Sequence, residues 1–185
     1  RDLLASRGRV ADEDYLTKLQ QKKARSYVEQ IENLEELPLY SGLNDFIFKI
    51  RSSDLKLAIA SGAIRKEIDL VLERAKLAEY FQIVVAADDI TTSKPKPDGY
   101  LLTIERLNQE YPELNLQPSE CLAIEDTLAG IQAAKAAGMK VVGVANTYPF
   151  HMLQRQSNWT VDYLNELELD RIQEFYSSTS DESDD

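Results

Sequence analysis

Cysteine and histidine are almost absent from this sequence of 185 residues, which contains one of each, Cys121 and His151. A single cysteine excludes a disulfide framework and a zinc site built from several cysteines. It favours a reducing compartment such as the cytoplasm, or the plastid stroma of a photosynthetic eukaryote. Because Cys121 lies in an apolar stretch, we expect a buried thiol that is not a nucleophile. His151 lies in a predicted loop beside Phe150, where we expect a packing or surface role.

Positive charge and long apolar runs are also scarce. The 32 acidic residues outnumber the 21 lysines and arginines, which gives a net charge of −11. This balance argues against nucleic acid or an acidic membrane as a partner. No apolar run approaches the roughly 18 residues that cross a membrane. The chain starts with Arg1 rather than methionine, so we expect the natural protein to begin upstream.

The composition fits one domain, or one domain with an appendage. A hydrophobic fraction of 43% is enough to form a core. The last nine residues, SSTSDESDD, carry four acidic side chains and no apolar face. We therefore predict a disordered acidic tail at residues 177–185.

The pattern before residue 55 is helical. Between residues 12 and 33, apolar residues at helical spacing predict one face with Tyr15, Leu19, Tyr27 and Ile31. The same segment carries a basic cluster, Lys18, Lys22, Lys23 and Arg25. Such a cluster is typical of a solvated helix face. A break at residues 37–42 precedes a second amphipathic helix.

From residue 55 onward, short apolar runs alternate with segments at helical spacing. We predict strands at residues 57–60, 81–87, 121–124 and 140–145, and a last edge strand at 159–161. Predicted helices separate the first four strands. This alternation indicates an α/β fold, with a parallel sheet covered by helices on both faces.

The most informative stretch is ECLAIEDTLAGIQAAKAAGM at residues 120–139. It predicts a strand that is followed by Glu125 and Asp126, and then an alanine-rich helix. Thr127 is a good N-cap for this helix, and Gly138 lies where a left-handed C-terminal cap is expected. Carboxyl ends of parallel strands bind ligands, and a carboxylate pair there suits Mg²⁺ held together with a substrate phosphate. Alternatively, the two acids only cap the helix.

Two other strand ends carry residues that suit phosphate. Ser61 follows the first predicted strand, where its hydroxyl and nearby backbone N–H groups could hold a phosphate. A Ser-Gly turn that caps the next helix is the alternative. Lys94 lies in SKPKPD, where two prolines stiffen the loop and direct a positive charge that a transferring phosphoryl group needs. An exposed loop lysine is the alternative for Lys94, and it is our preferred interpretation of Lys96.

Together these motifs resemble the haloacid dehalogenase-like (HAD) superfamily, and in particular its beta-phosphoglucomutase-like, subfamily IA phosphatase branch. The resemblance covers residues 37 to about 145. It is carried by LAIASG with Ser61, SKPKPD with Lys94, and AIEDTLAGIQAAKAAGM with Glu125 and Asp126. It implies a Rossmann-like parallel sheet with flanking helices, preceded by the end of a helical cap that closes over the substrate.

The resemblance also implies an activity: Mg²⁺-dependent phosphoryl transfer from a small phosphorylated metabolite, such as a sugar phosphate, through an aspartyl-phosphate. The implied site residues are Glu125 and Asp126 for the metal, Lys94, Ser61 and Gly62 for the phosphoryl group, and Lys23 for substrate contact from the cap. Hydrolysis is the expected outcome. A phosphomutase of the beta-phosphoglucomutase type stays open, because cap residues and a second aspartate decide between the two.

The first motif of the family, a strand that ends in D-x-D, has no good match here. Asp12-Glu13-Asp14 has the spacing, but the preceding Arg7-Gly8-Arg9 cannot form a buried strand. The resemblance implies that the missing strand lies between those ending at Ser61 and Ile124. We therefore expect an N-terminal segment outside this sequence to complete the sheet and supply the nucleophile. Without it, we expect this chain alone to be inactive.

These expectations divide the chain into three parts. Residues 1–37 form the C-terminal part of a helical cap, residues 38–176 form an α/β core that lacks its first strand, and residues 177–185 form the tail. A non-catalytic HAD-like binding or assembly subunit is a further alternative. So is a regulatory module that binds Mg²⁺ and phosphate without turnover.

Overall fold

The computed structural model describes residues 13–181, with some residues near both ends of this range described by their backbone alone. The helices are α2 (Glu13–Asn33), α3 (Leu43–Ser52), α4 (Arg65–Ala75), α5 (Asp98–Glu110), α6 (Leu128–Ala136), α7 (Phe150–Leu153) and α8 (Leu169–Asp181). The strands are β1 (Ala58–Ala60), β2 (Ile83–Val85), β3 (Leu122–Glu125), β4 (Lys140–Val144) and β5 (Trp159–Val161). Short 3-10 turns are η1 (Ala78–Tyr80), η2 (Ala87–Asp89), η3 (Pro118–Glu120) and η4 (Leu164–Glu166).

All the strand pairs are parallel, as the alternation of strands and helices predicts. β1 pairs with β2, with Ile59 opposite Val84. A second sheet has the order β3-β4-β5, with Ile124 opposite Val142 and with β5 at its edge, as predicted. β2 is shorter than the predicted strand at residues 81–87, because Phe81 caps the end of η1 and η2 begins at Ala87.

The two sheets are not joined by strand pairing within residues 13–181. β1 and β3 each have one edge without a pairing partner in this range, and Lys94 contacts the ends of both strands, at the Ala60 carbonyl oxygen and at Glu125. Ile124, in the interior of β3, is 39% exposed, although an apolar residue inside a covered sheet is normally buried. One side of β3 is therefore open next to its unpaired edge.

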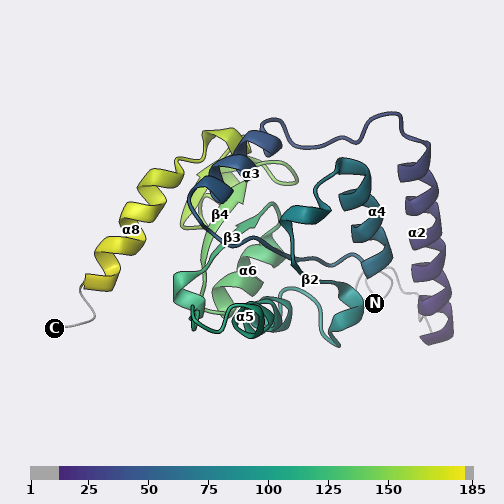
Figure 1. The fold of residues 1–185 in the computed structure, drawn as a ribbon. Coiled ribbons are helices and arrows are strands. Elements are labelled where there is room, and N and C mark those ends of the chain that lie inside the picture. The colour runs from purple at the N-terminus through teal and green to yellow at the C-terminus, as the bar shows by residue number, and fades with distance from the viewer. Residues whose placement is uncertain (1–12, 182–185) are drawn as a thin grey trace.

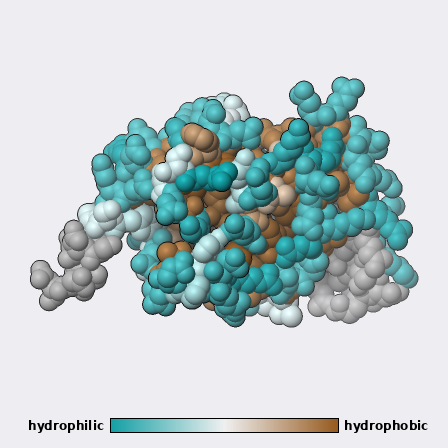
Figure 2. All heavy atoms as spheres, in the orientation of Figure 1, coloured by the Kyte–Doolittle hydropathy of each residue, from teal (hydrophilic) through white to brown (hydrophobic). Residues whose placement is uncertain are grey.

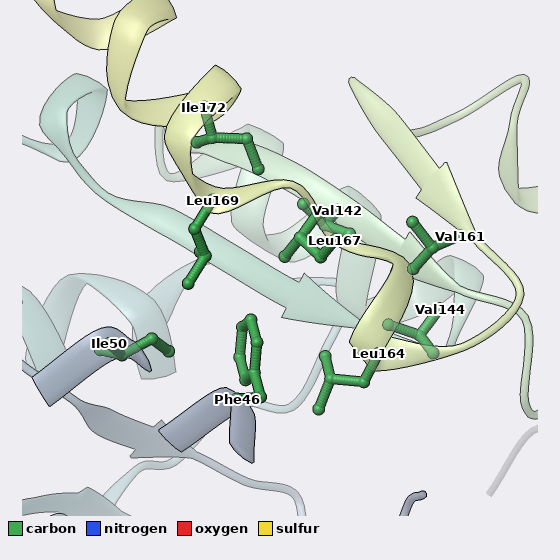
Figure 3. Packing of buried hydrophobic residues seen from close by; sticks show 9 residues of the cluster. All are labelled: Phe46, Ile50, Val142, Val144, Val161, Leu164, Leu167, Leu169 and Ile172. Atoms are coloured by element: carbon green, nitrogen blue, oxygen red, sulfur yellow. The ribbon is translucent and has the colours of Figure 1, made fainter. Parts of the chain in front are cut away.

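Helices pack on both faces of the sheets (Figure 1). α5 contacts β1 and β2, whereas α6 contacts β3 and β4. On the other face of β4, a cluster joins residues of the strands, of α3 and α8, and of the segment between β5 and α8 (Figure 3): Phe46, Ile50, Val142, Val144, Val161, Leu164, Leu167, Leu169 and Ile172. Each of these side chains contributes about 1.5–3 kcal/mol when fully buried. Val142 and Val144 face this cluster while Val141 faces α6, so β4 is a covered central strand.

Polar side chains cover most of the visible surface, and apolar residues reach it mainly across the middle (Figure 2). No helix among residues 13–181 is both long and apolar enough to span a bilayer.

α6 begins and ends as predicted. Thr127 is its N-cap, and the Thr127 Oγ1 accepts a hydrogen bond of 3.1 Å from the Gly130 N–H. This bond satisfies one of the free N–H groups of the first turn. Gly138 follows the helix with φ of 92°, a left-handed conformation that glycine adopts without strain. The carboxylates that precede Thr127 are therefore held at a rigid strand-to-helix junction.

The apolar face predicted for α2 is only partly buried. Ile31 is buried, whereas Tyr15, Leu19 and Tyr27 are exposed. α2 lies to one side of the sheets and packs against α4 (Figure 1). There the Arg74 guanidinium donates hydrogen bonds to the carbonyl oxygens of Ile31 and Leu34. This helix thus rests on the core through its C-terminal end.

Two further details differ from the sequence-based expectations. α8 continues to Asp181, so the predicted disordered tail is helical over residues 177–181, while residues 182–185 lie outside the described range. The helix continues because Ile172 and Tyr176 anchor its apolar side on the core. Cys121 precedes β3 rather than lying in it and is half-buried. Burial raises the pKa of its thiol to about 11, which keeps it protonated and unreactive at neutral pH.

The outer side of β2 is covered by arginine side chains. Arg65 and Arg106 both donate to the Val84 carbonyl oxygen, at 2.7 and 3.0 Å. Asp89 accepts from the same two guanidinium groups, at 2.6 and 3.2 Å, and from the Ala86 N–H at 2.8 Å. These contacts block the edge against pairing with another chain. The Ala86 N–H and the two arginines lower the pKa of Asp89 to about 2.

We expect Asp89→Asn to lower the free energy of unfolding at pH 7 by about 1–3 kcal/mol, because two arginines lose their shared counter-charge. The folded-state pKa is depressed, so the carboxylate stabilises the fold above the unfolded-state pKa of about 3.9. This contribution is lost as pH falls toward 2. Urea unfolding of both proteins between pH 7 and 3 measures the difference, which should shrink at low pH. Asp69→Asn, an exposed carboxylate on α4, is the control, and equal midpoints at pH 7 for all three proteins would contradict the assignment.

Candidate active site

The predicted phosphate-binding residues meet at the carboxyl ends of β1 and β2. Ser61, directly after β1, donates its N–H to the Val85 carbonyl oxygen (2.9 Å). Its Oγ accepts from the Ala63 N–H at 3.1 Å, so the serine also caps the turn before α4. Gly62 is exposed, and a side chain at this position would meet no atom within 4 Å. The backbone here is open to an approaching ligand.

A cavity of about 520 Å³ lies between this turn and the loop that follows β2. Ser61, Gly62 and Lys94 line it, together with Lys96 and the residues before Lys94. Lys94 is partly buried, and its Nζ donates to the Ala60 carbonyl oxygen at 3.1 Å. Lys96 is exposed, in agreement with its interpretation as a loop lysine. The cavity thus combines a positively charged side chain with open backbone.

Lys94 connects the two sheets. Its ammonium group forms an ion pair with Glu125 Oε1, at the end of β3. Glu125 is only 8% exposed, and a buried carboxylate is costly without a cation or donors beside it. The sequence motifs of Lys94 and Glu125 are therefore brought together as one charged pair.

Tyr100, on α5, completes this group, and the sequence analysis missed it. Its hydroxyl donates to Glu125 Oε1 at 2.5 Å and lies 3.5 Å from Lys94 Nζ. The ammonium also lies over the ring, 5.0 Å from its centroid. Burial, followed by the negative charge of Glu125, raises the pKa of Tyr100, so the hydroxyl stays protonated. In the sequence, Tyr100 is one of several apolar positions on a helix, which gives no signal of this role.

Asp126 lies beside the pair and is half-buried. Its Oδ2 accepts a hydrogen bond from Thr147 Oγ1, in the loop after β4. Tyr40, in the segment before α3, lies close enough to the same carboxylates to feel their charge. Burial first, and then the charges of Asp126 and Glu125, raise the pKa of Tyr40. Thr147 and Tyr40 belong to segments for which the sequence pattern predicted no site.

The first turn of α6 approaches the Glu125 carboxylate from the other side. Thr127 Oγ1 donates to Glu125 Oε2 at 3.2 Å. A Cβ atom built on Gly130 would overlap the Glu125 carboxylate. A glycine inside a helix is otherwise unfavourable, by about 1 kcal/mol relative to alanine. Gly130 is therefore explained by the space that the carboxylate needs.

The two carboxylates fit Mg²⁺ by their donor chemistry, but they supply only part of its ligands. In the part of the chain that the structure describes, no group of three or more Asp, Glu, His or Cys side chains could hold a metal ion. Mg²⁺ usually binds through one or two carboxylates together with water and substrate phosphates. Both oxygens of Glu125 already accept hydrogen bonds from protein groups. Asp126 is thus the more available ligand of the two.

Lys23 is not placed at this site. It lies within α2, whose described contacts are with α4, and its side chain is not described. Glu13 and Asp14 begin the same helix, which agrees with the conclusion that Asp12-Glu13-Asp14 is not the strand-end motif; Asp12 lies outside the described residues.

Known proteins resemble this chain in sequence. The chain is 32% identical over 133 residues to protein CbbY of Rhodobacter capsulatus, with 70% of this chain and 55% of that protein covered. It is 31% identical over 136 residues to a phosphorylated carbohydrates phosphatase of Thermotoga maritima, with 73% and 57% covered. The chain thus spans little more than half the length of these curated relatives.

Solved structures of other proteins have a similar fold. A beta-phosphoglucomutase from Clostridium difficile superposes with a TM-score of 0.74 at 26% identity, over 91% of this chain and 70% of that one. A HAD hydrolase of family IA, variant 3, from Entamoeba histolytica reaches a TM-score of 0.78 at 20% identity, over 95% and 77% of the two chains, which shows the shared fold. The family model for haloacid dehalogenase-like hydrolases matches residues 6–144, more than half of the sequence. The chain therefore belongs to the haloacid dehalogenase-like hydrolase family.

Proposed function

We propose that this protein is an Mg²⁺-dependent phosphoryl-transfer hydrolase acting on a small phosphorylated metabolite, with a sugar phosphate as the substrate class. The observation that carries the proposal is the convergence of Ser61, Lys94 and Glu125 from three separate segments at the strand ends. The names of several relatives support the substrate class. They include a phosphorylated carbohydrates phosphatase, a beta-phosphoglucomutase and a fructose-1-phosphate phosphatase.

Each residue has a role that follows from its surroundings. Ser61 Oγ and the open backbone at Gly62 bind phosphate oxygens, since N–H groups at a helix start favour anions. Lys94 offsets the negative charge of the phosphoryl group during transfer. Asp126, with Glu125, would hold Mg²⁺, which when bound supplies positive charge beside the phosphate oxygens.

The attacking carboxylate of the proposed reaction comes from a segment other than residues 13–181. We place this segment as a strand between β1 and β3, where it would complete one continuous sheet and bring an aspartate beside Lys94. Two observations support this position: Lys94 contacts the ends of both β1 and β3, each of which has an unpaired edge within residues 13–181, and Ile124 is exposed on β3. The aspartyl-phosphate formed there would then be hydrolysed.

Residues 1–37, with α2, are proposed to belong to a helical cap from which Lys23 contacts the substrate. We propose the cytoplasm as the compartment and neither nucleic acid nor membrane as a partner. Phosphomutase activity is the second candidate, because the chain is 29% identical over 152 residues to the beta-phosphoglucomutase of Bacillus subtilis. A non-catalytic binding subunit is the remaining alternative.

We expect Asp126→Asn to raise the Mg²⁺ concentration for half-maximal activity about 10–100-fold, because the more available carboxylate is lost. The measurement is an Mg²⁺ titration of phosphate release from sugar phosphates, using the natural protein that contains this chain. Asp162→Asn, an exposed carboxylate after β5, is the control for the loss of one negative charge. An Asp126→Asn titration that overlays that of the parent protein removes Asp126 from the metal site.

A further inference from the structure

The Lys94 ammonium has three partners, and this limits what it can do for a substrate. Its Nζ lies 3.1 Å from the Ala60 carbonyl oxygen and 3.5 Å from the Tyr100 hydroxyl, and it pairs directly with Glu125. An ammonium group has three protons. To donate to a phosphate oxygen in the adjoining cavity, Lys94 must therefore weaken one of these contacts.

The contact with Glu125 is the hardest to weaken. Its carboxylate is buried, and without a bound Mg²⁺ the removal of the lysine cation leaves that charge without compensation. Tyr100 changes this balance, because its hydroxyl donates to the same oxygen, Oε1, at 2.5 Å. Thr127 Oγ1 donates a hydrogen bond to the other oxygen, Oε2, at 3.2 Å. Glu125 thus keeps two neutral donors when the lysine turns toward the cavity.

Packing holds the Tyr100 side chain in place, so it can keep its position when Lys94 turns toward the cavity. It is 7% exposed, and its ring packs with Ala123 of β3 and with Ile131 of α6 in one core cluster. The lysine also keeps a favourable position over this ring, 5.0 Å from the centroid. The ring and the hydroxyl therefore define one fixed side of the space in which the ammonium moves.

We infer that Tyr100 is a positioning residue that holds Glu125 so that Lys94 is free to engage the phosphoryl group of the substrate. The inference rests on the proposed function, since it assumes that Lys94 offsets the negative charge of a phosphoryl group. Without the hydroxyl, Glu125 retains the lysine, and the transferring phosphoryl group is less well neutralised.

The test compares Tyr100→Phe with Tyr111→Phe in the natural protein that contains this chain. Tyr111 caps the C-terminal end of the same helix and also has a lysine over its ring, Lys56 at 5.2 Å, but it lies away from the site. We expect Tyr100→Phe to lower kcat at least tenfold with less than a threefold change in KM. We also expect the Kd for inorganic phosphate, measured by calorimetry with Mg²⁺ present, to rise at least threefold. Tyr111→Phe should stay within twofold of the parent protein in all three quantities.

The outcomes separate this inference from the proposed function. If the parent protein releases phosphate and Tyr100→Phe has the same kcat, Tyr100 has only a structural role and the inference is wrong, even if the variant is less stable. If the parent protein has no turnover, the proposed function fails, and the Kd for phosphate then tests the role of Tyr100. Weaker phosphate binding by Tyr100→Phe supports the inference, and equal binding overturns it. A parent protein that binds no phosphate contradicts both.

Discussion

Lys94→Ala is expected to abolish phosphate release and to lower the free energy of unfolding by about 3 kcal/mol. The first effect arises because Lys94 is the one cation among the described residues that both lines the cavity and pairs with Glu125. The second arises because Glu125, 8% exposed, then lacks a cation and keeps only the Tyr100 and Thr127 hydroxyls. Steady-state kinetics and urea unfolding measure the two effects on the same preparation.

A second variant separates stability from activity. Lys94→Ala combined with Glu125→Gln removes both charges, so we expect most of the lost stability to return while phosphate release stays absent. Lys66→Ala, an exposed lysine on α4, controls for the loss of one positive charge and should retain full activity. Phosphate release by folded Lys94→Ala near the parent rate would remove Lys94 from the site.

Gly130→Ala is expected to destabilise the protein by about 1–3 kcal/mol and to reduce phosphate release strongly. The change would ordinarily stabilise a helix by about 1 kcal/mol. Here the new methyl group overlaps the Glu125 carboxylate, which must then leave Lys94 and Tyr100. An ordinary helix would be stabilised by this change, whereas we expect this protein to be destabilised. The sign of the change in the free energy of unfolding therefore tests where the Glu125 carboxylate lies.

Gly99→Ala is the matched control for this helix substitution. Gly99 lies in the first turn of α5, where an added Cβ would meet Ile90 Cδ1 at 3.5 Å, an ordinary contact. We expect its free energy of unfolding to equal or exceed that of the parent protein. If Gly130→Ala is stabilised by the same amount, the Glu125 carboxylate does not occupy the position described here.

Much of the fold follows from local sequence patterns. Thr127 and Gly138 mark the ends of α6, and apolar runs mark the strands, because these signals depend on neighbouring residues alone. The meeting of Lys94 with Glu125 was also predictable, since parallel strands bring their carboxyl ends to one edge. The order of the motifs along the chain, together with the family resemblance, predicted one shared site.

The contacts that tune the site were not predictable from the sequence. Tyr100 reaches Glu125 only because α5 packs across β1 and β2, and Thr147 reaches Asp126 only because β4 lies beside β3. Such contacts depend on how elements pack, which a periodic pattern does not encode. The same holds for α8, whose polar last turn reads as disordered although its first turns are anchored on the core.

The most direct test is the release of inorganic phosphate from a panel of sugar phosphates by the natural protein that contains this chain, measured with and without Mg²⁺. Lys94→Ala is measured in parallel. We predict release from at least one sugar phosphate that requires Mg²⁺ and disappears in the variant. Release that persists after Mg²⁺ is removed, or that Lys94→Ala leaves unchanged, would contradict a phosphoryl-transfer site at the ends of β1 and β3.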